Sequence, residues 1–316
     1  MFGQVEDLLP VISFGSKQDS ATEKRHAEFV QRMVRRGYTE RQVRRLVDWL
    51  VEGGVGGVFV LGTTGEAASL PERARRELAR LAIERVAGRC LVYAGIGSNC
   101  LEESVAAGRE YLALGAHAVV AHLPAYFPLA PAEMVEYYRL LADRLEGPLV
   151  IYNMPPTTHM SIPLDALDEL SRHPNVVALK DSENDLGRLK NVIAAFRGRP
   201  DFAVFIGPSV HAAETLAAGA DGVVPSSGNL APHLWRRLYD HVRAERRSEA
   251  AAVQQQLNAI GHVYQAGRSL GQMMAGLKAA LEARGLCGPT VLPPLRTLEP
   301  AERGRIRDEL ESLALA

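Results

Sequence analysis

The chain has 316 residues, a formal net charge of −1 and 47% hydrophobic residues, the profile of a soluble globular protein with one large domain or a domain and an appendage. This charge provides no broad basic surface for nucleic acid or an anionic membrane, and no apolar run approaches the roughly 20 residues that span a bilayer. The three cysteines, Cys90, Cys100 and Cys287, are too few and too scattered for a disulfide framework or a zinc cluster. We therefore expect neither a nucleic-acid nor a membrane partner, and no metal.

Three predictions concern the N-terminal region. Its first residues lack the basic-then-apolar pattern of a secretory signal, which predicts a cytoplasmic protein. The polar and charged segment 15–38 predicts a partly helical lid or a surface insertion, and the sequence does not decide between them. The basic run from Arg32 to Arg45 is expected to form a solvated helix face rather than a nucleic-acid patch.

Short β-branched runs recur along the chain, each nearly continuous in apolar residues, as in parallel strands that are buried on both faces. In chain order they are LPVIS (9–13), GGVFVL (56–61), CLVYAGI (90–96), HAVVAH (117–122), PLVIY (148–152), NVVALK (175–180), FAVFIG (202–207) and DGVVPS (221–226). Helical periodicity separates them, as at residues 71–88 and 163–174, and Gly115 and Gly219 are expected to end helices. Eight strands alternating with helices predict an α/β fold, the (β/α)8 TIM barrel.

A doubly wound open sheet is the structural alternative, but it usually has fewer strands and a glycine-rich first turn. The sequence GIGSNC (95–100) lacks the third glycine of the dinucleotide-binding pattern, so we expect no nucleotide cofactor, and no other cofactor. After residue 232 the sequence is helical almost to its end. We therefore predict a barrel domain at residues 1–232 and a C-terminal helical domain at residues 233–316.

Polar residues and glycines fall at the carboxyl ends of the predicted strands, where active sites of TIM barrels lie. These residues come from distant parts of the chain, and their convergence on one face is the strongest indication of a site. They are Gly62, Thr63, Thr64, Gly65 and Glu66 after the second strand, Tyr152 at the end of the fifth, Lys180 at the end of the sixth, Gly207 at the end of the seventh, and Val224 and Ser226 at the eighth.

Lys180 ends an apolar strand, which is an unusual place for a lysine. A side chain that reaches solvent is the ordinary alternative. Because four uncharged residues of a central strand precede Lys180, we expect its amine inside the barrel mouth. Desolvation disfavours an ammonium ion, and a neutral amine can attack a ketone to form a Schiff base. The protonated imine then accepts electrons from an adjacent carbon–carbon bond, and this chemistry needs no metal.

Schiff-base chemistry also requires a proton carrier, and Tyr152 on the adjacent strand is the natural candidate. A tyrosine is a poor base unaided, so a hydroxyl relay from Thr64 would assist it. The backbone amides and hydroxyl groups of the Gly-Thr-Thr turn, including Thr63, could hold the carboxylate of pyruvate. The alternative for both threonines is a turn that caps a helix N-terminus.

Three motifs together resemble the dihydrodipicolinate synthase/N-acetylneuraminate lyase family. They are GTTGE after the second strand, YN-x-P after the fifth and LKDS after the sixth. The resemblance implies a class I, pyruvate-dependent aldolase or lyase on a (β/α)8 barrel with a C-terminal helical extension. It implies that Lys180 forms the Schiff base, that Tyr152 carries protons, and that Thr63 and Thr64 bind the carboxylate and relay protons. It also implies a homotetramer built as a dimer of dimers, in which Tyr126 completes a relay across a subunit interface.

Departures from the family pattern bear on the substrate. Thr157 stands where dihydrodipicolinate synthases have an arginine that grips the carboxylate of the semialdehyde substrate. Pro208 and Ser209 stand where sialic acid lyases have acidic residues. His159 replaces a usual glycine and could contact the substrate, contact another subunit or be a simple loop residue. Ser226 is expected to touch the distal end of the substrate.

The sequence therefore predicts a Schiff-base lyase or aldolase that splits or joins pyruvate and an aldehyde. A 2-keto-3-deoxy sugar acid or a related 2-oxo acid is the expected cleaved compound. The first alternative is 4-hydroxy-tetrahydrodipicolinate synthase activity, with aspartate semialdehyde as the aldehyde. A 2-oxo acid dehydratase and a non-catalytic keto-acid sensor are further alternatives.

Overall fold

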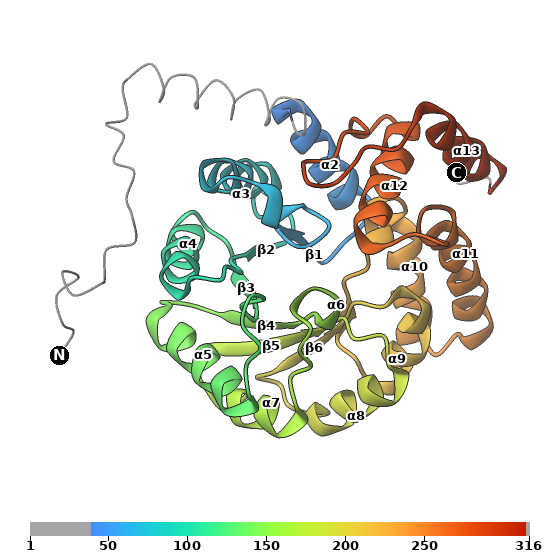
Figure 1. Cartoon of the computed structure of the whole chain (residues 1–316). Coiled ribbons are helices and arrows are strands. Elements are labelled where there is room, and N and C mark those ends of the chain that lie inside the picture. The colour runs from blue at the N-terminus through green and yellow to red at the C-terminus, as the bar shows by residue number, and fades with distance from the viewer. Residues whose placement is uncertain (1–38, 314–316) are drawn as a thin grey trace, which may run out of the picture.

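The computed structural model describes residues 39–313, in which a parallel sheet is ringed by helices (Figure 1). The strands pair in their chain order, each parallel to the next. They are β1 (Gly57–Val60), β2 (Leu91–Gly95), β3 (Ala118–His122), β4 (Leu149–Asn153), β5 (Val176–Asp181), β6 (Ala203–Ile206) and β7 (Gly222–Val223). The second to eighth predicted strands are thus confirmed. The first predicted strand and the segment 15–38 lie outside the described residues.

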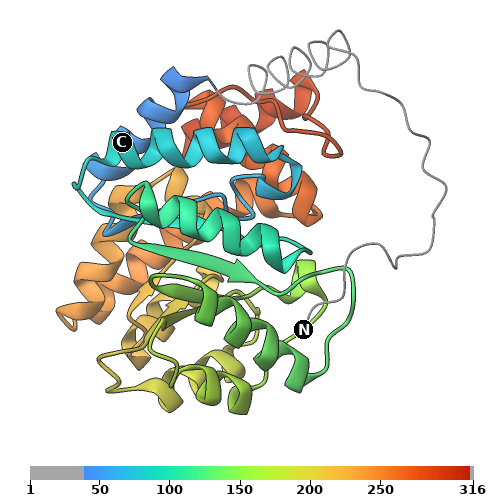
Figure 2. The same cartoon turned by 90° about the vertical axis from the view of Figure 1, so that its left-hand side faces the viewer.

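Helices connect successive strands, since neighbouring parallel strands need a crossover connection. The helix before the first strand is α2 (Glu40–Glu52). The helices between strands are α3 (Glu72–Val86), α4 (Leu101–Ala113), α5 (Pro131–Arg144), α6 (Pro155–Thr158), α7 (Leu164–Leu170), α8 (Leu186–Phe196) and α9 (Ala212–Ala218). The helices after the last strand are α10 (Pro232–Arg243), α11 (Arg247–Gln265), α12 (Leu270–Ala283) and α13 (Pro300–Ser312). Short 3-10 helices lie at η2 (Ala67–Ser69), η3 (Ser209–His211) and η4 (Ser226–Asn229). Figure 2 shows α3 and α4 side by side over one flank of the sheet.

Local sequence explains where several helices begin and end. A capping box between Thr39 and Gln42 starts α2, whose buried face carries Val43 and Val47. Gly115 and Gly219 follow the last turns of α4 and α9 with φ angles of 103° and 112°, a conformation that favours glycine, so the expectation for both residues is confirmed.

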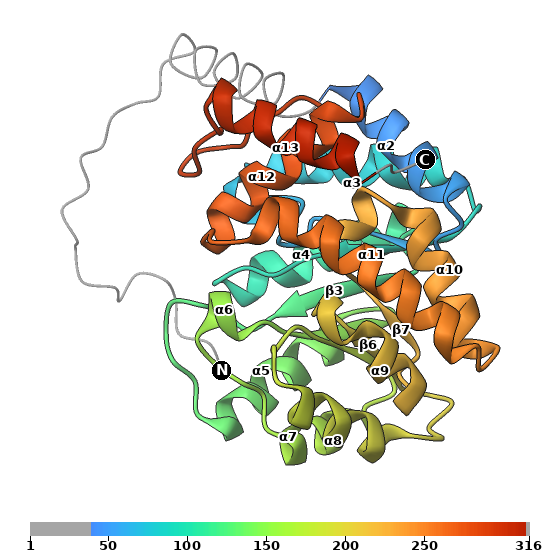
Figure 3. The ribbon, with the colours of Figure 1, turned by 90° about the vertical axis from the view of Figure 1, so that its right-hand side faces the viewer.

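The helices after β7 form an extension that packs beside the barrel (Figure 3). Its core is continuous with α9, because Leu216 of that helix belongs to the same apolar cluster as Trp235, Tyr264 and Leu310. The helix α10 packs against both α2 and α11. The C-terminal helical extension is confirmed, and the domain boundary at residue 232 stays a prediction.

Alternation of side chains along the strands creates two apolar layers. Val120, Val150, Tyr152 and Ala178 form a cluster inside the sheet. Intervening residues, such as Ile151, join the larger core beneath the surrounding helices. Lys180 follows Ala178 on β5 by two residues and therefore shares its inward direction, which positions the site at the carboxyl ends of the strands. None of the helices within residues 39–313 has the length and apolar character needed to cross a membrane.

Candidate active site

Lys180 lies near the end of β5 with its amine in an aromatic setting. The residue is 8% exposed, and its Nζ lies 4.7 Å from the ring centroid of Phe59 and 4.2 Å from that of Tyr152. The β4–β5 register places Tyr152 directly beside Lys180. The side chain therefore does not extend into solvent, which was the ordinary alternative for a lysine at a strand end.

The hydroxyl of Tyr152 connects this pair to the loop that follows β1. It lies 3.4 Å from Thr63 Oγ1 and donates a hydrogen bond of 3.2 Å to Met154 Sδ. A tyrosine hydroxyl has one proton, so while it donates to Met154 it accepts from Thr63. The sequence assigned the relay to Thr64, and the described residues contain no hydrogen bond between Thr64 and Tyr152.

The electrostatic setting favours ionisation of Tyr152. Burial, the largest single influence, would by itself raise the pKa of Tyr152. The positive charge of Lys180 and hydrogen bonds with Thr63, Ser182 and Lys180 together outweigh burial, and the pKa of Tyr152 falls below its ordinary value. A tyrosine that ionises more readily is better suited to move protons near neutral pH.

The loop between β1 and η2 is held in a tight turn. Leu61 and Glu66 have φ angles of 58° and 53°, in the left-handed region that most side chains avoid. Glu66 is the N-cap of η2, and that helix has no side-chain capping bond, so the capping alternative for Thr63 and Thr64 is not realised there. A Cβ on Gly62 would come within 2.8 Å of the Phe59 ring, so glycine allows the loop to rest on that ring.

Glu66 joins this loop to the C-terminal helices, a role that the sequence analysis did not predict. Its side chain is 1% exposed, and Oε1 lies 2.6 Å from Nζ of Lys278 on α12. Its Oε2 accepts a hydrogen bond of 2.6 Å from the backbone N–H of Leu292. Lys278 in turn donates to the carbonyl of Thr290 at 2.7 Å. A lone lysine within the apolar segment MMAGLKAAL was the available signal for a buried ion pair.

Two strand ends approach each other beside Lys180. Gly207 follows β6, and a Cβ there would come within 2.1 Å of Ser182 Oγ, so only glycine leaves room. The N–H of Gly207 donates to the carbonyl of Asp181 at 2.7 Å. Ser182, two residues after Lys180, is a second polar group of the site that the sequence analysis did not assign.

Thr157 and His159 lie together in the segment after β4. Thr157 Oγ1 donates to the carbonyl of Met154 at 3.2 Å and stabilises the turn of α6. His159 is exposed and has a φ of 58°, a backbone conformation that glycine adopts more readily than other residues.

The remaining predicted residues have contacts outside the Lys180–Tyr152–Thr63 group or are exposed. Val224 follows β7, and its N–H donates to the carbonyl of Ile206 at 2.8 Å. Ser226 Oγ lies 2.7 Å from the hydroxyl of Tyr264 on α11, so the C-terminal helices occupy its polar group. Tyr126 is 76% exposed, and the contacts described within one chain do not join it to Lys180, Tyr152 or Thr63.

Comparison with known proteins gives a consistent result. A model of the dihydrodipicolinate synthetase family matches residues 30–313. A model of the PrkA serine protein kinase C-terminal domain matches residues 1–49, most of which lie outside the described residues. The chain is 31% identical over 271 residues to the 4-hydroxy-tetrahydrodipicolinate synthase of Gluconacetobacter diazotrophicus, covering 86% of this chain and 90% of that protein.

Two Escherichia coli K12 proteins are also similar. The chain is 30% identical over 269 residues to the probable 2-dehydro-3-deoxy-D-pentonate aldolase YjhH, covering 84% of this chain and 88% of that protein. The crystal structure of YagE, a prophage protein belonging to the dihydrodipicolinic acid synthase family, was solved in complex with pyruvate. It superposes with a TM-score of 0.83 and 28% identity, covering 89% of this chain and 94% of that one.

Proposed function

Because the chain belongs to the dihydrodipicolinate synthetase family of lyases and aldolases, we propose that it splits or joins pyruvate and an aldehyde through a Schiff base on Lys180. The observation that carries this proposal is the placement of the buried Lys180 amine 4.2 Å from the ring of Tyr152, whose hydroxyl in turn meets Thr63. The complex of YagE with pyruvate supports pyruvate as the keto acid.

The reaction begins when the Lys180 amine attacks the ketone carbon of the 2-oxo acid. A carbon–nitrogen bond forms, the ketone oxygen gains a proton, and the resulting carbinolamine loses water to give the protonated imine. In this proposal Tyr152 delivers the proton that water loss requires and recovers it later. Its lowered pKa makes both directions of transfer accessible.

Cleavage then breaks the bond between the carbon adjacent to the imine carbon and the hydroxyl-bearing carbon beyond it. The bond electrons move into the protonated imine and form an enamine, while tyrosinate at position 152 takes the proton of the substrate hydroxyl, and the aldehyde leaves. Protonation of the enamine carbon and addition of water return pyruvate and the free Lys180 amine. Condensation follows the same steps in reverse.

We propose different roles for Thr63 and Thr64, namely proton relay and carboxylate binding. Thr63 relays protons with Tyr152, since its hydroxyl is the one that lies within 3.4 Å of the tyrosine oxygen. Thr64 and the backbone amides of the turn bind the carboxylate of pyruvate. This assignment exchanges the roles that the sequence gave to Thr63 and Thr64. We further propose that Gly62 and Gly207 border the bound keto acid.

The proposed cleaved compound is a 2-keto-3-deoxy sugar acid or a related 2-oxo acid. Thr157 has no charge with which to clamp a second carboxylate, and its hydroxyl already donates to the backbone. We propose that His159, an exposed polar residue of the same turn with a left-handed backbone, contacts the hydroxyl groups of the aldehyde. We assign Val224 and Ser226 to the opposite rim, where the distal part of the substrate would lie. The similarity to YjhH supports this substrate class.

Synthesis of 4-hydroxy-tetrahydrodipicolinate from pyruvate and aspartate semialdehyde is the second candidate, because the relative from Gluconacetobacter diazotrophicus has that name. The two candidates are separated by an assay that combines pyruvate with glycolaldehyde, D-glyceraldehyde or aspartate semialdehyde. We expect condensation with the hydroxyaldehydes. Activity confined to aspartate semialdehyde would establish the second candidate instead, and a Lys180→Ala variant with full turnover would contradict both.

We also propose a homotetramer, and a cytoplasmic location stays a prediction. Tyr126 and Phe127 are 76% and 69% exposed, and their rings stack edge to face with 4.9 Å between centroids. A neighbouring subunit would cover this aromatic pair and bring Tyr126 to the relay of the partner. Size-exclusion chromatography with light scattering should give the mass of four chains, and a monomer would contradict the role of Tyr126.

A further inference from the structure

A buried polar network lies directly behind the two residues that carry the proposed chemistry. Asn153 follows Tyr152 on β4, Asp181 follows Lys180 on β5, and the strands pair these residues in register. Successive side chains of a strand point to opposite faces, so Asn153 and Asp181 lie on the helix-covered side of the sheet. They are 1% and 0% exposed.

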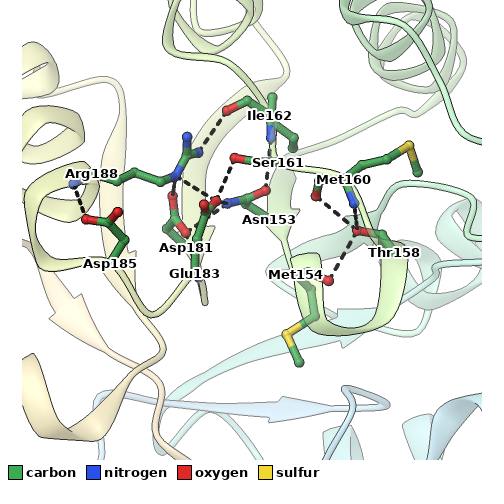
Figure 4. A network of polar contacts seen from close by, with 10 residues as sticks. All are labelled: Asn153, Met154, Thr158, Met160, Ser161, Ile162, Asp181, Glu183, Asp185 and Arg188. Carbon is green, nitrogen blue, oxygen red and sulfur yellow. Dashed lines mark hydrogen bonds and ion pairs between the residues drawn. The ribbon is translucent and has the colours of Figure 1, made fainter.

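Asp181 is the centre of the network (Figure 4). Its Oδ1 accepts hydrogen bonds of 2.9 Å from Asn153 Nδ2 and from the N–H of Glu183. Its Oδ2 accepts a hydrogen bond of 3.0 Å from Nε of Arg188, at the start of α8. Burial of an ionised carboxylate is costly unless such partners satisfy it. The strand pairing alone does not require these side chains.

The network continues into the segment after β4, as Figure 4 shows. Arg188 donates through its second guanidinium nitrogen to the carbonyl of Ile162 at 2.8 Å, and the N–H of Ile162 donates to Asn153 Oδ1 at 3.1 Å. Ser161 Oγ donates to Glu183 Oε2 at 2.6 Å, and that carboxylate lies 3.1 Å from Nε of Arg188. Ser161 and Ile162 are thus hydrogen-bonded to Glu183 and Arg188, which follow Lys180 in the chain.

Ser161 and Ile162 lie at one end of the turn that carries Thr157 and His159. At its other end the turn leaves β4 at Met154, whose carbonyl accepts hydrogen bonds from Thr157 and from the buried Thr158. Thr158 also donates to the carbonyl of Met160. The turn is therefore internally rigid, and its orientation relative to β5 depends on the side chains of Arg188, Glu183 and Asn153.

Lys180 and Tyr152 do not depend on these side chains in the same way. Their relative position follows from the β4–β5 backbone pairing, which continues to Asn153 and Asp181 and to a 2.9 Å hydrogen bond from the N–H of Ser182 to the carbonyl of Asn153. Loss of the side-chain network would leave this ladder in place and release the turn.

We propose that Asp181, Arg188 and Glu183 are positioning residues that orient the Thr157–His159 turn toward the aldehyde half of the substrate. They act on aldehyde binding and leave imine formation by Lys180 unaffected. This inference rests on the proposed function and deepens it, because it assigns the two halves of the substrate to two differently supported parts of the site.

The test compares Arg188→Met and Ser161→Ala with Arg172→Met as a control. Arg172 is an exposed arginine that pairs with Asp168, and within residues 39–313 no hydrogen bond or ion pair joins it to the residues of the network. Four quantities are measured: the borohydride-trapped pyruvate adduct, KM for pyruvate, KM for D-glyceraldehyde, and kcat. Arg188→Met should form the adduct as the parent does and keep its KM for pyruvate. Its KM for D-glyceraldehyde should rise about ten- to a hundredfold.

Ser161→Ala removes one exposed hydroxyl and should cause a smaller rise in the same KM, with folding unchanged. It decides the matter if Arg188→Met does not fold. Unchanged KM values for D-glyceraldehyde in the folded variants would overturn the inference. Loss of adduct formation together with a rise of both KM values would also overturn it, because that result would indicate a general structural role. If the parent protein forms no adduct, the proposed function fails first, and the inference falls with it.

Discussion

The hydroxyl oxygen of Thr63 lies 3.4 Å from that of Tyr152, and through Tyr152 the loop after β1 reaches the amine of Lys180. The hydrogen-bond partner of the tyrosine hydroxyl in this loop is therefore the first threonine of the GTTGE motif. This contact also lowers the pKa of Tyr152, because it favours the ionised hydroxyl.

Replacing Thr63 by valine should slow the reaction more than the same change at Thr64. Thr63→Val removes a hydrogen bond to the proton carrier, and we expect kcat to fall about tenfold, the effect of one hydrogen bond of roughly 1.4 kcal/mol. Thr64→Val should mainly raise KM for pyruvate. Steady-state kinetics of both variants check this, and the reverse pattern would restore the relay role to Thr64.

Removal of the Lys180 charge should raise the pKa of Tyr152. Burial already opposes ionisation of this tyrosine, and Lys180 is the strongest influence in the other direction. In Lys180→Met the tyrosinate absorbance should therefore appear at higher pH than in the parent. An equally large change in Lys190→Met, whose lysine is exposed and pairs with Glu214, would contradict this explanation.

The same lowered pKa has a defined effect on stability. Since folding lowers the pKa of Tyr152, its ionisation stabilises the fold in alkaline solution, and that contribution is lost as the pH falls through the folded-state pKa. The parent should thus lose less stability than Lys180→Met at alkaline pH. Denaturant titrations near neutral pH and in alkaline solution measure the difference.

The buried pair of Glu66 and Lys278 should stabilise the contact between the active-site loop and α12. Lys278→Met removes an ammonium group 2.6 Å from a buried carboxylate, and we expect the free energy of unfolding to fall by about 3–5 kcal/mol. Changing Glu66 to glutamine in the same chain should recover part of the loss. Urea titrations of the two single variants and the double variant give the coupling energy, and strict additivity would refute the pairing.

The left-handed backbone of His159 allows a test that separates conformation from substrate contact. Both His159→Gly and His159→Ala remove the imidazole, so both should raise KM for the aldehyde equally. Only glycine adopts a φ of 58° without strain, so His159→Gly should be more stable than His159→Ala by about 1 kcal/mol. Unchanged aldehyde kinetics in both variants would mean that His159 is a simple loop residue.

The sequence predicted the barrel because its strands are buried on both faces and read as continuous apolar runs. The strand that ends at Lys180 is an example, since Val176–Leu179 precede the lysine without interruption. Tyr152 is the last residue but one of the partner strand β4 and lies in the same layer, so the proximity of these two residues follows from topology. The last strand was predicted at residues 221–226 and is observed at Gly222–Val223, because Pro225 cannot extend the ladder.

Features that depend on turn geometry and long-range packing could not be predicted from the sequence. Which of Thr63 and Thr64 faces Tyr152 is decided by a loop with two non-glycine residues in the left-handed region, Leu61 and Glu66. The pairing of Glu66 with Lys278 joins segments from opposite ends of the chain. No local pattern specifies such a partner, although a lysine between apolar residues indicates that one is needed.

The central claim is that Lys180 forms an imine with pyruvate, and trapping that imine tests it most directly. The protein is incubated with pyruvate and borohydride, and intact mass and peptide mapping locate the product. We predict one reduced pyruvate adduct per chain, on Lys180, and none in Lys180→Ala. An unmodified Lys180 at high pyruvate concentration, or an adduct on a different lysine, would contradict the account.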